Sequence, residues 1–287
     1  METIKTMLDA ARQGQYAIGA FNVYNLETVD AVLSAANDLR SPVIIALGER
    51  YLEHFPIHAV AAIVKTLAQD SHVPVALHLD HAQKLESIEL AISAGFTSVM
   101  IDGSKLPLAE NIALTKRAMA LARLHGVSVE AELGRVVRTG AAETDLFTDP
   151  KEAQQFMEET EVDALAIAVG TVHGLYKGKP ILDLARLAQI AKKVSVPLAL
   201  HGGSGLPDHL IKSAIQLGVA KLNVNTEISI QGVNAVRGFL SEKGNENTRL
   251  EELMIEARHS MVEVVEKYIE FFGSAGKIQT LFVNSCS

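Results

Sequence analysis

Short apolar segments alternate with longer segments of helical period along most of the chain. The short segments are rich in Val, Ile and Ala and have the lengths of buried strands. Eight such segments occur, at Ala17–Val23, Val43–Leu47, Val75–Asp80, Ser98–Asp102, Ser128–Leu133, Ala164–Val169, Leu198–His201 and Ala220–Val224. Helix signals lie between them, such as Asp149 before Pro150, and Gly218 after Leu217. This pattern predicts a parallel sheet with helical crossovers.

The eight strand–helix units show no change of composition and no Pro/Gly/Ser-rich linker between halves. They favour an α/β fold with one (β/α)₈ barrel over residues 1–287. The alternative is a doubly wound sheet, which usually carries a glycine-rich dinucleotide turn after its first strand, and Phe21–Asn25 contains none. Extra helices are expected in a C-terminal extension from about residue 227, at about 227–240 and 251–272.

Composition narrows the functional classes. Apolar residues make up 48% of 287 residues, and the formal net charge is −8 without a long basic run, so nucleic acid is not an expected partner. The N-terminal 15 residues predict an amphipathic helix, not a signal peptide, and no apolar run is long enough to span a membrane. Cys286 is the only cysteine, which excludes an intrachain disulfide. A cytoplasmic location fits these features.

Polar residues stand where the predicted strands end, which is the active face of such a barrel. They are Asn22, Asp80, His81, Asp102, Glu130, Glu132, His173, His201 and the segment 223–226. His81, His173 and His201 follow or end three different strands. Three imidazoles that leave a fourth position open are typical of a catalytic zinc site. His78 lies two residues before Asp80 and therefore faces the same way, in a structural or substrate-orienting role. The remaining histidines are interpreted as surface or core residues.

Two segments predict a phosphate site. His201 is followed by Gly202, Gly203, Ser204 and Gly205, and glycines let backbone N–H groups approach an anion closely. The eighth strand ends in Asn223, Val224, Asn225 and Thr226, which supply polar side chains and a helix start. A tight turn that needs glycine only for its geometry is the alternative.

A metal, a carboxylate and a phosphate site together point to retro-aldol cleavage of a ketose phosphate. A Lewis acid polarises the carbonyl and stabilises the enediolate, while the phosphate anchors the fragment. Asp80, which ends the third predicted strand directly before His81, is the candidate to transfer the proton.

Seven segments then identify a family. They are AFNVYN (20–25), LHLDHA (77–82), SVMIDGS (98–104), VEAELG (129–134), VGTVHGLYKG (169–178), LHGGSGLP (200–207) and KLNVNTE (221–227). In this order they resemble the class II, zinc-dependent ketose-bisphosphate aldolases, across nearly the whole chain. The resemblance implies a homodimer or homotetramer that cleaves a phosphorylated ketose to dihydroxyacetone phosphate and an aldehyde.

The resemblance also implies roles for single residues. His81, His173 and His201 would hold Zn²⁺, and Asp80 would be the general acid/base. Asp102 and Glu132 would flank the metal or hold a second, exchangeable one, and a monovalent cation, Na⁺ or K⁺, would lie near the glycine loops. The dihydroxyacetone phosphate portion would be bound by Asn22, Gly174, Gly202, Gly203, Ser204, Asn223, Val224, Asn225 and Thr226, with Asn223 near the enediolate.

Two segments depart from the family pattern. Residues 135–148 are shorter than the family's mobile loop, and Glu143 is the residue that could supply the loop's glutamate. The loop after the second strand reads Gly48-Glu49-Arg50-Tyr51 and lacks small residues. Arg50, Arg138 and Arg258 are candidates to bind an anionic group at the far end of the substrate, or are surface residues. Fructose bisphosphate, tagatose bisphosphate, a deoxy-ketogluconate phosphate and other acidic sugar phosphates stay open as substrates.

Two other functions compete with the metal aldolase. A Schiff-base aldolase would need a strand lysine such as Lys221, which is expected at the N-terminal end of the eighth strand, away from the active face. A non-catalytic or altered-specificity barrel that binds sugar phosphates would keep the pocket, and the shortened loop is the argument for it.

Overall fold

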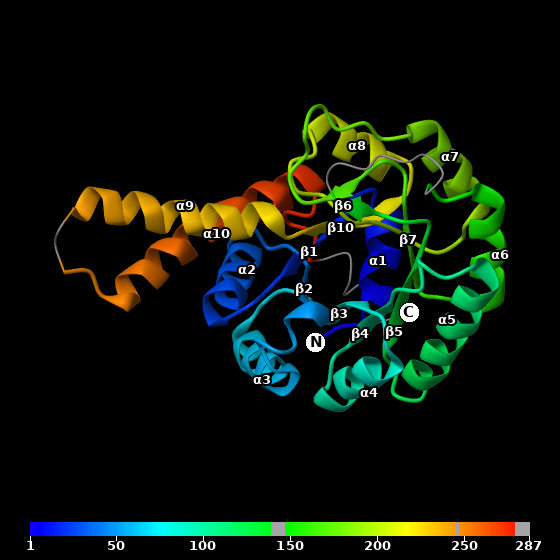
Figure 1. Ribbon diagram of the computed structural model, residues 1–287, viewed down its shortest axis with the longest axis horizontal. Helices are drawn as coiled ribbons and strands as arrows, with labels where there is room; N and C mark the ends of the chain where they lie inside the picture. Colours follow the sequence, from blue (N-terminus) through cyan, green and yellow to red (C-terminus); the bar gives the residue numbers. More distant parts are fainter. Residues whose placement is uncertain (139–146, 245–246, 279–287) are drawn as a thin grey trace.

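Eight parallel strands close into a barrel in the computed structural model, which describes residues 1–138, 147–244 and 247–278 (Figure 1). Around the barrel the strands follow the order β1-β10-β9-β7-β5-β4-β3-β2. Their bounds are β1 Ile18–Asn22, β2 Val43–Gly48, β3 Val75–Ala82, β4 Ser98–Ile101, β5 Ser128–Leu133, β7 Ala164–Ile167, β9 Leu198–Leu200 and β10 Val219–Val224. The predicted (β/α)₈ barrel is confirmed, and its closure excludes the doubly wound sheet.

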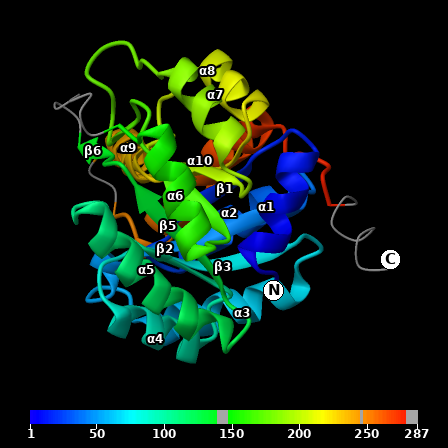
Figure 2. The same cartoon turned by 90° about the vertical axis from the view of Figure 1, so that its right-hand side faces the viewer.

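Helices surround the barrel, as two perpendicular views show (Figures 1 and 2). They are α1 Ile4–Gln13, α2 Leu26–Asp38, α3 Ile57–Leu67, α4 Leu85–Ala94, α5 Leu108–Arg123, α6 Pro150–Thr160, α7 Leu184–Lys193, α8 Asp208–Gln216, α9 Thr226–Lys243 and α10 Leu250–Phe272, with short 3₁₀ turns η1 Glu49–Tyr51 and η2 Ala68–Asp70. A separate parallel pair, β6 Val137–Arg138 and β8 Val172–His173, was not predicted, because two-residue strands leave no periodic pattern. Among the described helices, none combines the length and apolar composition that a bilayer crossing requires.

The N-terminal end of the barrel is closed by α1. Ile4, Met7 and Leu8 of this helix are fully buried in one cluster with Ile18 and Ala20 of β1 and with inward-facing residues of other strands. The small residues of the strands leave room for the larger side chains of the helix. One end of the barrel is thus filled with apolar side chains, and polar side chains gather at the other.

The two C-terminal helices project from the barrel as an antiparallel pair (Figure 1). Their predicted positions are confirmed to within a few residues. The longer helix, α10, packs along both α9 and α2 and buries Val265, Tyr268 and Ile269. Toward the tip of the pair, Leu250 and Ile255 are exposed.

Two strands contain irregularities that redirect side chains. In β3 the register against β4 shifts between Leu79 and Ala82, and His81 takes a left-handed backbone conformation with φ 53°. In β10 the register against β9 shifts between Val219 and Lys221. A bulge breaks the simple alternation of inward and outward residues. Adjacent residues of β3 and β10 therefore reach positions that strict alternation would not give them.

Asp149 caps the N-terminus of α6, as the sequence predicted. Its carboxylate accepts hydrogen bonds from the backbone N–H groups of Lys151 (2.7 Å) and Glu152 (3.1 Å). We expect Asp149→Ala to lower the free energy of unfolding by about 1 kcal/mol at neutral pH, as measured by urea denaturation. Asp149→Ser keeps an oxygen at this position and is the control.

The effect of Asp149→Ala should depend on pH. Hydrogen bonds from the N–H groups of Glu152 and Lys151 hold the pKa of Asp149 below its usual value. The stabilisation is therefore complete above the unfolded-state pKa and is lost as the pH falls through the folded-state pKa. Equal stability of the Ala variant and the original protein at neutral pH would contradict the assignment.

Candidate active site

Three histidine rings meet at the C-terminal mouth of the barrel, the end where the strands finish. His81 lies in β3, His173 in β8, and His201 directly after β9. The ring centroids of His81 and His201 are 4.5 Å apart, those of His81 and His173 are 5.1 Å apart, and those of His173 and His201 are 6.2 Å apart. His81 Nε2 and His201 Nδ1 approach to 2.9 Å. Rings from three separate segments therefore face one small space.

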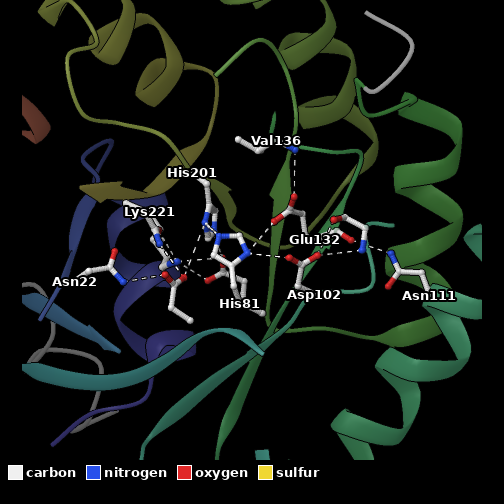
Figure 3. A network of polar contacts seen from close by, with 12 residues as sticks. Asn22, His81, Asp102, Asn111, Glu132, Val136, His201 and Lys221 are labelled. Carbon is white, nitrogen blue, oxygen red and sulfur yellow. Dashed lines mark hydrogen bonds and ion pairs between the residues drawn. The ribbon is translucent and has the colours of Figure 1, made fainter. Parts of the chain in front are cut away.

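Two carboxylates flank the other edge of His81 (Figure 3). His81 Nδ1 lies 3.0 Å from Asp102 Oδ2 and 3.5 Å from Glu132 Oε2. Burial opposes the charge on His81, but Asp80 and Asp102 raise its pKa to about 9. Burial and the nearby Asp102 raise the pKa of Glu132 to about 8. Glu132 Oε2 is buried and accepts no hydrogen bond from the described residues, so it is available to a ligand.

Asp80 is a buried carboxylate held by two amides. Asn22 Nδ2 donates to its Oδ2 and Asn223 Nδ2 donates to its Oδ1, each at 3.0 Å. Burial alone would raise the pKa of Asp80, but the neighbouring His81 and His201 hold it well below its usual value. Asp80 is therefore an ionised, oriented base beside the histidines.

A buried ion pair lies beneath these groups. Lys221 Nζ is 2.8 Å from Glu130 Oε2 and also donates to Asn223 Oδ1 at 2.7 Å. Glu130 Oε1 lies 2.9 Å from His201 Nε2. The expectation that Lys221 lies away from the active face was wrong, because its side chain points into the barrel on the same side as that of Asn223, two residues later, and its amine reaches Asn223 and Glu130.

His78 lies in the same buried layer as this ion pair. Its Nδ1 is 2.8 Å from Ser98 Oγ, and its Nε2 is 3.8 Å from Glu130 Oε2. Burial and the Lys221 amine lower the pKa of His78 to about 3. The ring is therefore neutral and sits below the space that the other three histidines face.

The glycine loop after His201 is fixed on both sides. A Cβ on Gly202 (φ 74°) would lie 2.3 Å from the Val172 carbonyl oxygen, and Gly203 N donates to the Asn223 carbonyl oxygen at 2.9 Å. Tyr176 OH donates to the Gly202 carbonyl oxygen at 2.9 Å. Close backbone contacts therefore require glycine in this loop even without a ligand.

Ser204 joins this loop to the N-terminus of α9. Its buried Oγ accepts weak hydrogen bonds from Asn225 N (3.3 Å) and Glu227 N (3.4 Å). Gly174, with φ 99°, follows His173. Thr226 is the first residue of α9, so the loop and a helix N-terminus lie together. Val224 is fully buried in the core, so only its backbone can face a ligand.

Other predicted site residues lie apart or cannot be placed. Arg258, on α10, pairs with Asp30 of α2. Arg50 is exposed next to the mouth, where its guanidinium carbon lies 4.6 Å from the Tyr51 ring centroid. Glu143 and the Arg138 side chain lie outside the part of the chain that the structure describes.

Sequence reasoning missed several contacts at this mouth. Glu130 was noted at a strand end but not recognised as a partner of Lys221. Asn225 was expected at the phosphate site, yet its Oδ1 also accepts from Tyr24 OH and its Nδ2 donates to Tyr51 OH at 3.3 Å. The signal for Glu130 was available, because a glutamate in an apolar strand needs a buried partner.

The donor atoms at the mouth fit a divalent metal ion. Asp80, His81 and His201 offer one set of ligand atoms that lie within 4.8 Å of one another, and His81, Asp102 and Glu132 offer a second. Imidazole nitrogens and carboxylate oxygens are the donors that zinc accepts in catalytic sites. His173 is outside both sets in this arrangement, although its ring faces the same space.

Comparison with known proteins gives consistent results. A sequence model of the family described as "Fructose-bisphosphate aldolase class-II" matches residues 2–277. A "Probable fructose-bisphosphate aldolase" from Bacillus subtilis (strain 168) is 45% identical over 282 residues, which cover 94% of this chain and 97% of that protein.

Solved structures share the fold over nearly the whole chain. The YdjI aldolase from Escherichia coli K12 matches with a TM-score of 0.87 and 36% identity, covering 96% of this chain and 99% of the other. Fructose-bisphosphate aldolase (Fba) from Campylobacter jejuni matches with a TM-score of 0.83 and 25% identity, covering 95% of this chain and 94% of the other. These matches, together with the clustered histidines and carboxylates, show that this chain is an aldolase of the class II fructose-bisphosphate aldolase family.

Proposed function

We propose that this aldolase is zinc-dependent and reversibly cleaves a phosphorylated ketose to dihydroxyacetone phosphate and an aldehyde. The observation that carries the proposal is the group formed by the buried Asp80 and His201 and the half-buried His81, which combines an ionised base with two imidazoles whose nitrogens lie 2.9 Å apart. Family membership supports a metal-dependent aldol reaction at this site.

His81, His173 and His201 are the proposed zinc ligands. A bound zinc ion supplies a Lewis acid that polarises the ketose carbonyl. Burial and the neighbouring His81 lower the pKa of His173 to about 3, so this ring is neutral and able to act as a ligand. Asp102 and Glu132, with His81, are proposed to accept a second, exchangeable ion.

Asp80 is the proposed general base for cleavage. It removes the proton from the ketose hydroxyl on the carbon that becomes the aldehyde. The adjacent carbon–carbon bond then breaks, and its electron pair passes to the dihydroxyacetone phosphate fragment as an enediolate. Proton return to that fragment completes the reaction, and the reverse sequence forms the bond. Asn22 and Asn223 orient Asp80, and we propose that Asn223 also lies next to the enediolate.

The phosphate is proposed to bind between the glycine loop and α9. Gly174, Gly202 and Gly203 bring backbone close to the mouth, and Ser204 links the loop to the helix N-terminus. A helix N-terminus favours an anion through its free N–H groups and its dipole. We also propose that a Na⁺ or K⁺ ion binds beside these loops.

A Schiff-base mechanism is disfavoured by the position of Lys221. A nucleophilic lysine must present an uncharged amine to the substrate. The Lys221 side chain is fully buried, and its amine is held by the Glu130 carboxylate and the Asn223 amide oxygen. These contacts hold the amine away from the substrate, so Lys221 is not the nucleophile.

The aldehyde half of the substrate is proposed to be anionic. Arg50 stands at the mouth next to Tyr51, and it has no carboxylate partner among the residues described. Substrate binding by Arg258, a catalytic role for Glu143, and assembly into a dimer or tetramer stay predictions. The names of the relatives make fructose bisphosphate the first ketose to assay, and tagatose bisphosphate and a deoxy-ketogluconate phosphate are the comparisons.

Metal removal tests the central proposal. Dialysis against a chelator should abolish cleavage, because the electrophile is lost, and added Zn²⁺ should restore it. Borohydride added with the substrate should leave the enzyme active. Activity that survives in metal-free protein, together with inactivation by borohydride, would replace the metal mechanism with a Schiff base.

Asp80→Asn tests the proton transfer. The amide cannot act as a base, so kcat should fall by ~10²-fold or more while the zinc content stays the same. Steady-state cleavage and metal analysis give both quantities. Asp70→Asn, at an exposed position of η2, is the matched control. Full turnover by Asp80→Asn would show that another group moves the proton.

Gly203→Ala tests the phosphate site. The added Cβ would lie 2.8 Å from the Asn223 carbonyl oxygen, so the loop must move away from β10. KM for the ketose phosphate should rise roughly tenfold, the equivalent of one weakened hydrogen bond to a charged group, without loss of zinc. Gly238→Ala in α9 is the control, since its methyl meets no atom within 4 Å. An unchanged KM would remove the loop from the phosphate site.

A further inference from the structure

The proposed reaction makes no direct use of the Glu130–Lys221 ion pair, yet both side chains are fully buried. Removal of two charges from water is unfavourable, and a pair of apolar residues would fill the same space at lower cost. The pair also lies directly below the catalytic groups, within hydrogen-bond distance of His201 and Asn223. A function in arranging those two residues would explain why charges are kept here.

Glu130 determines which nitrogen of His201 carries its hydrogen. The Lys221 ammonium lies 3.0 Å from Glu130 Oε1 and 2.8 Å from Oε2, so the ion-paired carboxylate only accepts hydrogen bonds. His201 Nε2, at 2.9 Å, must therefore donate. A neutral imidazole with its hydrogen on Nε2 has its lone pair on Nδ1. That nitrogen is the one that faces His81 Nε2.

Lys221 determines the orientation of the Asn223 amide. The ammonium group can only donate, so the amide oxygen of Asn223 must face it at 2.7 Å. The amide nitrogen is then directed to Asp80 Oδ1 at 3.0 Å. The reversed amide would place its oxygen against the carboxylate and its nitrogen against the ammonium.

We propose that Glu130 and Lys221 are positioning residues that together set the tautomer of His201 and the amide orientation of Asn223. One ion pair thereby prepares a metal ligand on one side and the partner of the general base on the other. The inference rests on the proposed function in treating His201 as a zinc ligand and Asp80 as the base. Hydrogen-bond partners behind a metal ligand commonly orient the ligand in this way.

The first measurement needs no substitution. Metal-free protein labelled with ¹⁵N-histidine, studied by two-bond ¹H–¹⁵N correlation NMR at neutral pH, should show His201 with its hydrogen on Nε2. The His201→Gln spectrum identifies the signals. A hydrogen on Nδ1 would overturn the proposal. Because this readout uses no metal, it is independent of whether the protein binds zinc.

Glu130→Gln should leave His201 as a mixture of both tautomers. Lys221 Nζ lies 3.0 Å from Glu130 Oε1 and 2.8 Å from Oε2, so the new NH₂ group lies beside the ammonium in either orientation of the amide, and the hydrogen on His201 Nε2 is no longer held by a charge. Zinc affinity, measured by competition with a chelator, should then fall by about 10–100-fold, the usual effect of losing such a partner. An unchanged tautomer and a zinc affinity within twofold of the original would overturn the role of Glu130.

The double variant Glu130→Gln/Lys221→Met separates positioning from simple stability. Without the ammonium, the amide introduced at position 130 can turn its oxygen to His201, so the Nε2–H tautomer and most of the zinc affinity should return. Asn223 loses its contact with Lys221 and keeps only the one with Asp80, so its amide is less firmly oriented and kcat at saturating zinc should stay at least about tenfold below that of the original enzyme. Zinc binding no tighter than in Glu130→Gln would overturn the proposal for His201, and full recovery of kcat would overturn it for Asn223.

Glu132→Gln is the matched control for the NMR experiment. It changes a second buried glutamate of β5, but one that lies beside His81 and not His201. The His201 tautomer should be unchanged in this variant, and a mixture of tautomers would show that any change in β5 disturbs the ring. If the original protein binds no zinc at all, the proposed function fails, while the tautomer result stands by itself.

Discussion

The chemistry of the barrel mouth depends on two consecutive residues, Asp80 and His81, that face the same space. In a regular strand their side chains would point to opposite faces. The bulge in β3 and the left-handed backbone of His81 bring both to one side. A non-glycine residue in this conformation stores backbone strain of order 1 kcal/mol, which the surrounding barrel must offset. The base and its neighbouring ring are thus paired through a local departure from regular structure.

Polar groups below the mouth make that arrangement rigid. Glu130 contacts both His201 and Lys221, and the amine of Lys221 continues to Asn223. In a low-dielectric interior, each contact is strong when it is satisfied and costly when it is broken. Ordinary barrels fill this layer with branched apolar side chains, whereas here polar ones support the site.

The sequence was sufficient to predict the barrel fold, because each strand is an apolar segment with clear boundaries. It also predicted that His81 and His201 would meet, since strand ends of a barrel share one face. The position of Lys221 was predicted wrongly, because its place near the start of the strand was considered without the length of its side chain, which reaches Glu130 and Asn223. The left-handed His81 was invisible in the sequence, because side-chain chemistry does not report backbone dihedral angles. Glu143 lies outside the described residues, and its role stays a prediction.

Within the part of the chain that the structure describes, α1 and the strands fill the N-terminal end of the barrel with apolar side chains, which leaves the opposite end for the substrate to enter. On the proposed reaction, the ketose enters and both fragments depart by the same route, so each turnover must clear the entrance before the next can start. A molecule bound at that entrance would block both substrate binding and product release. Product release, as well as bond cleavage itself, can therefore limit the turnover rate.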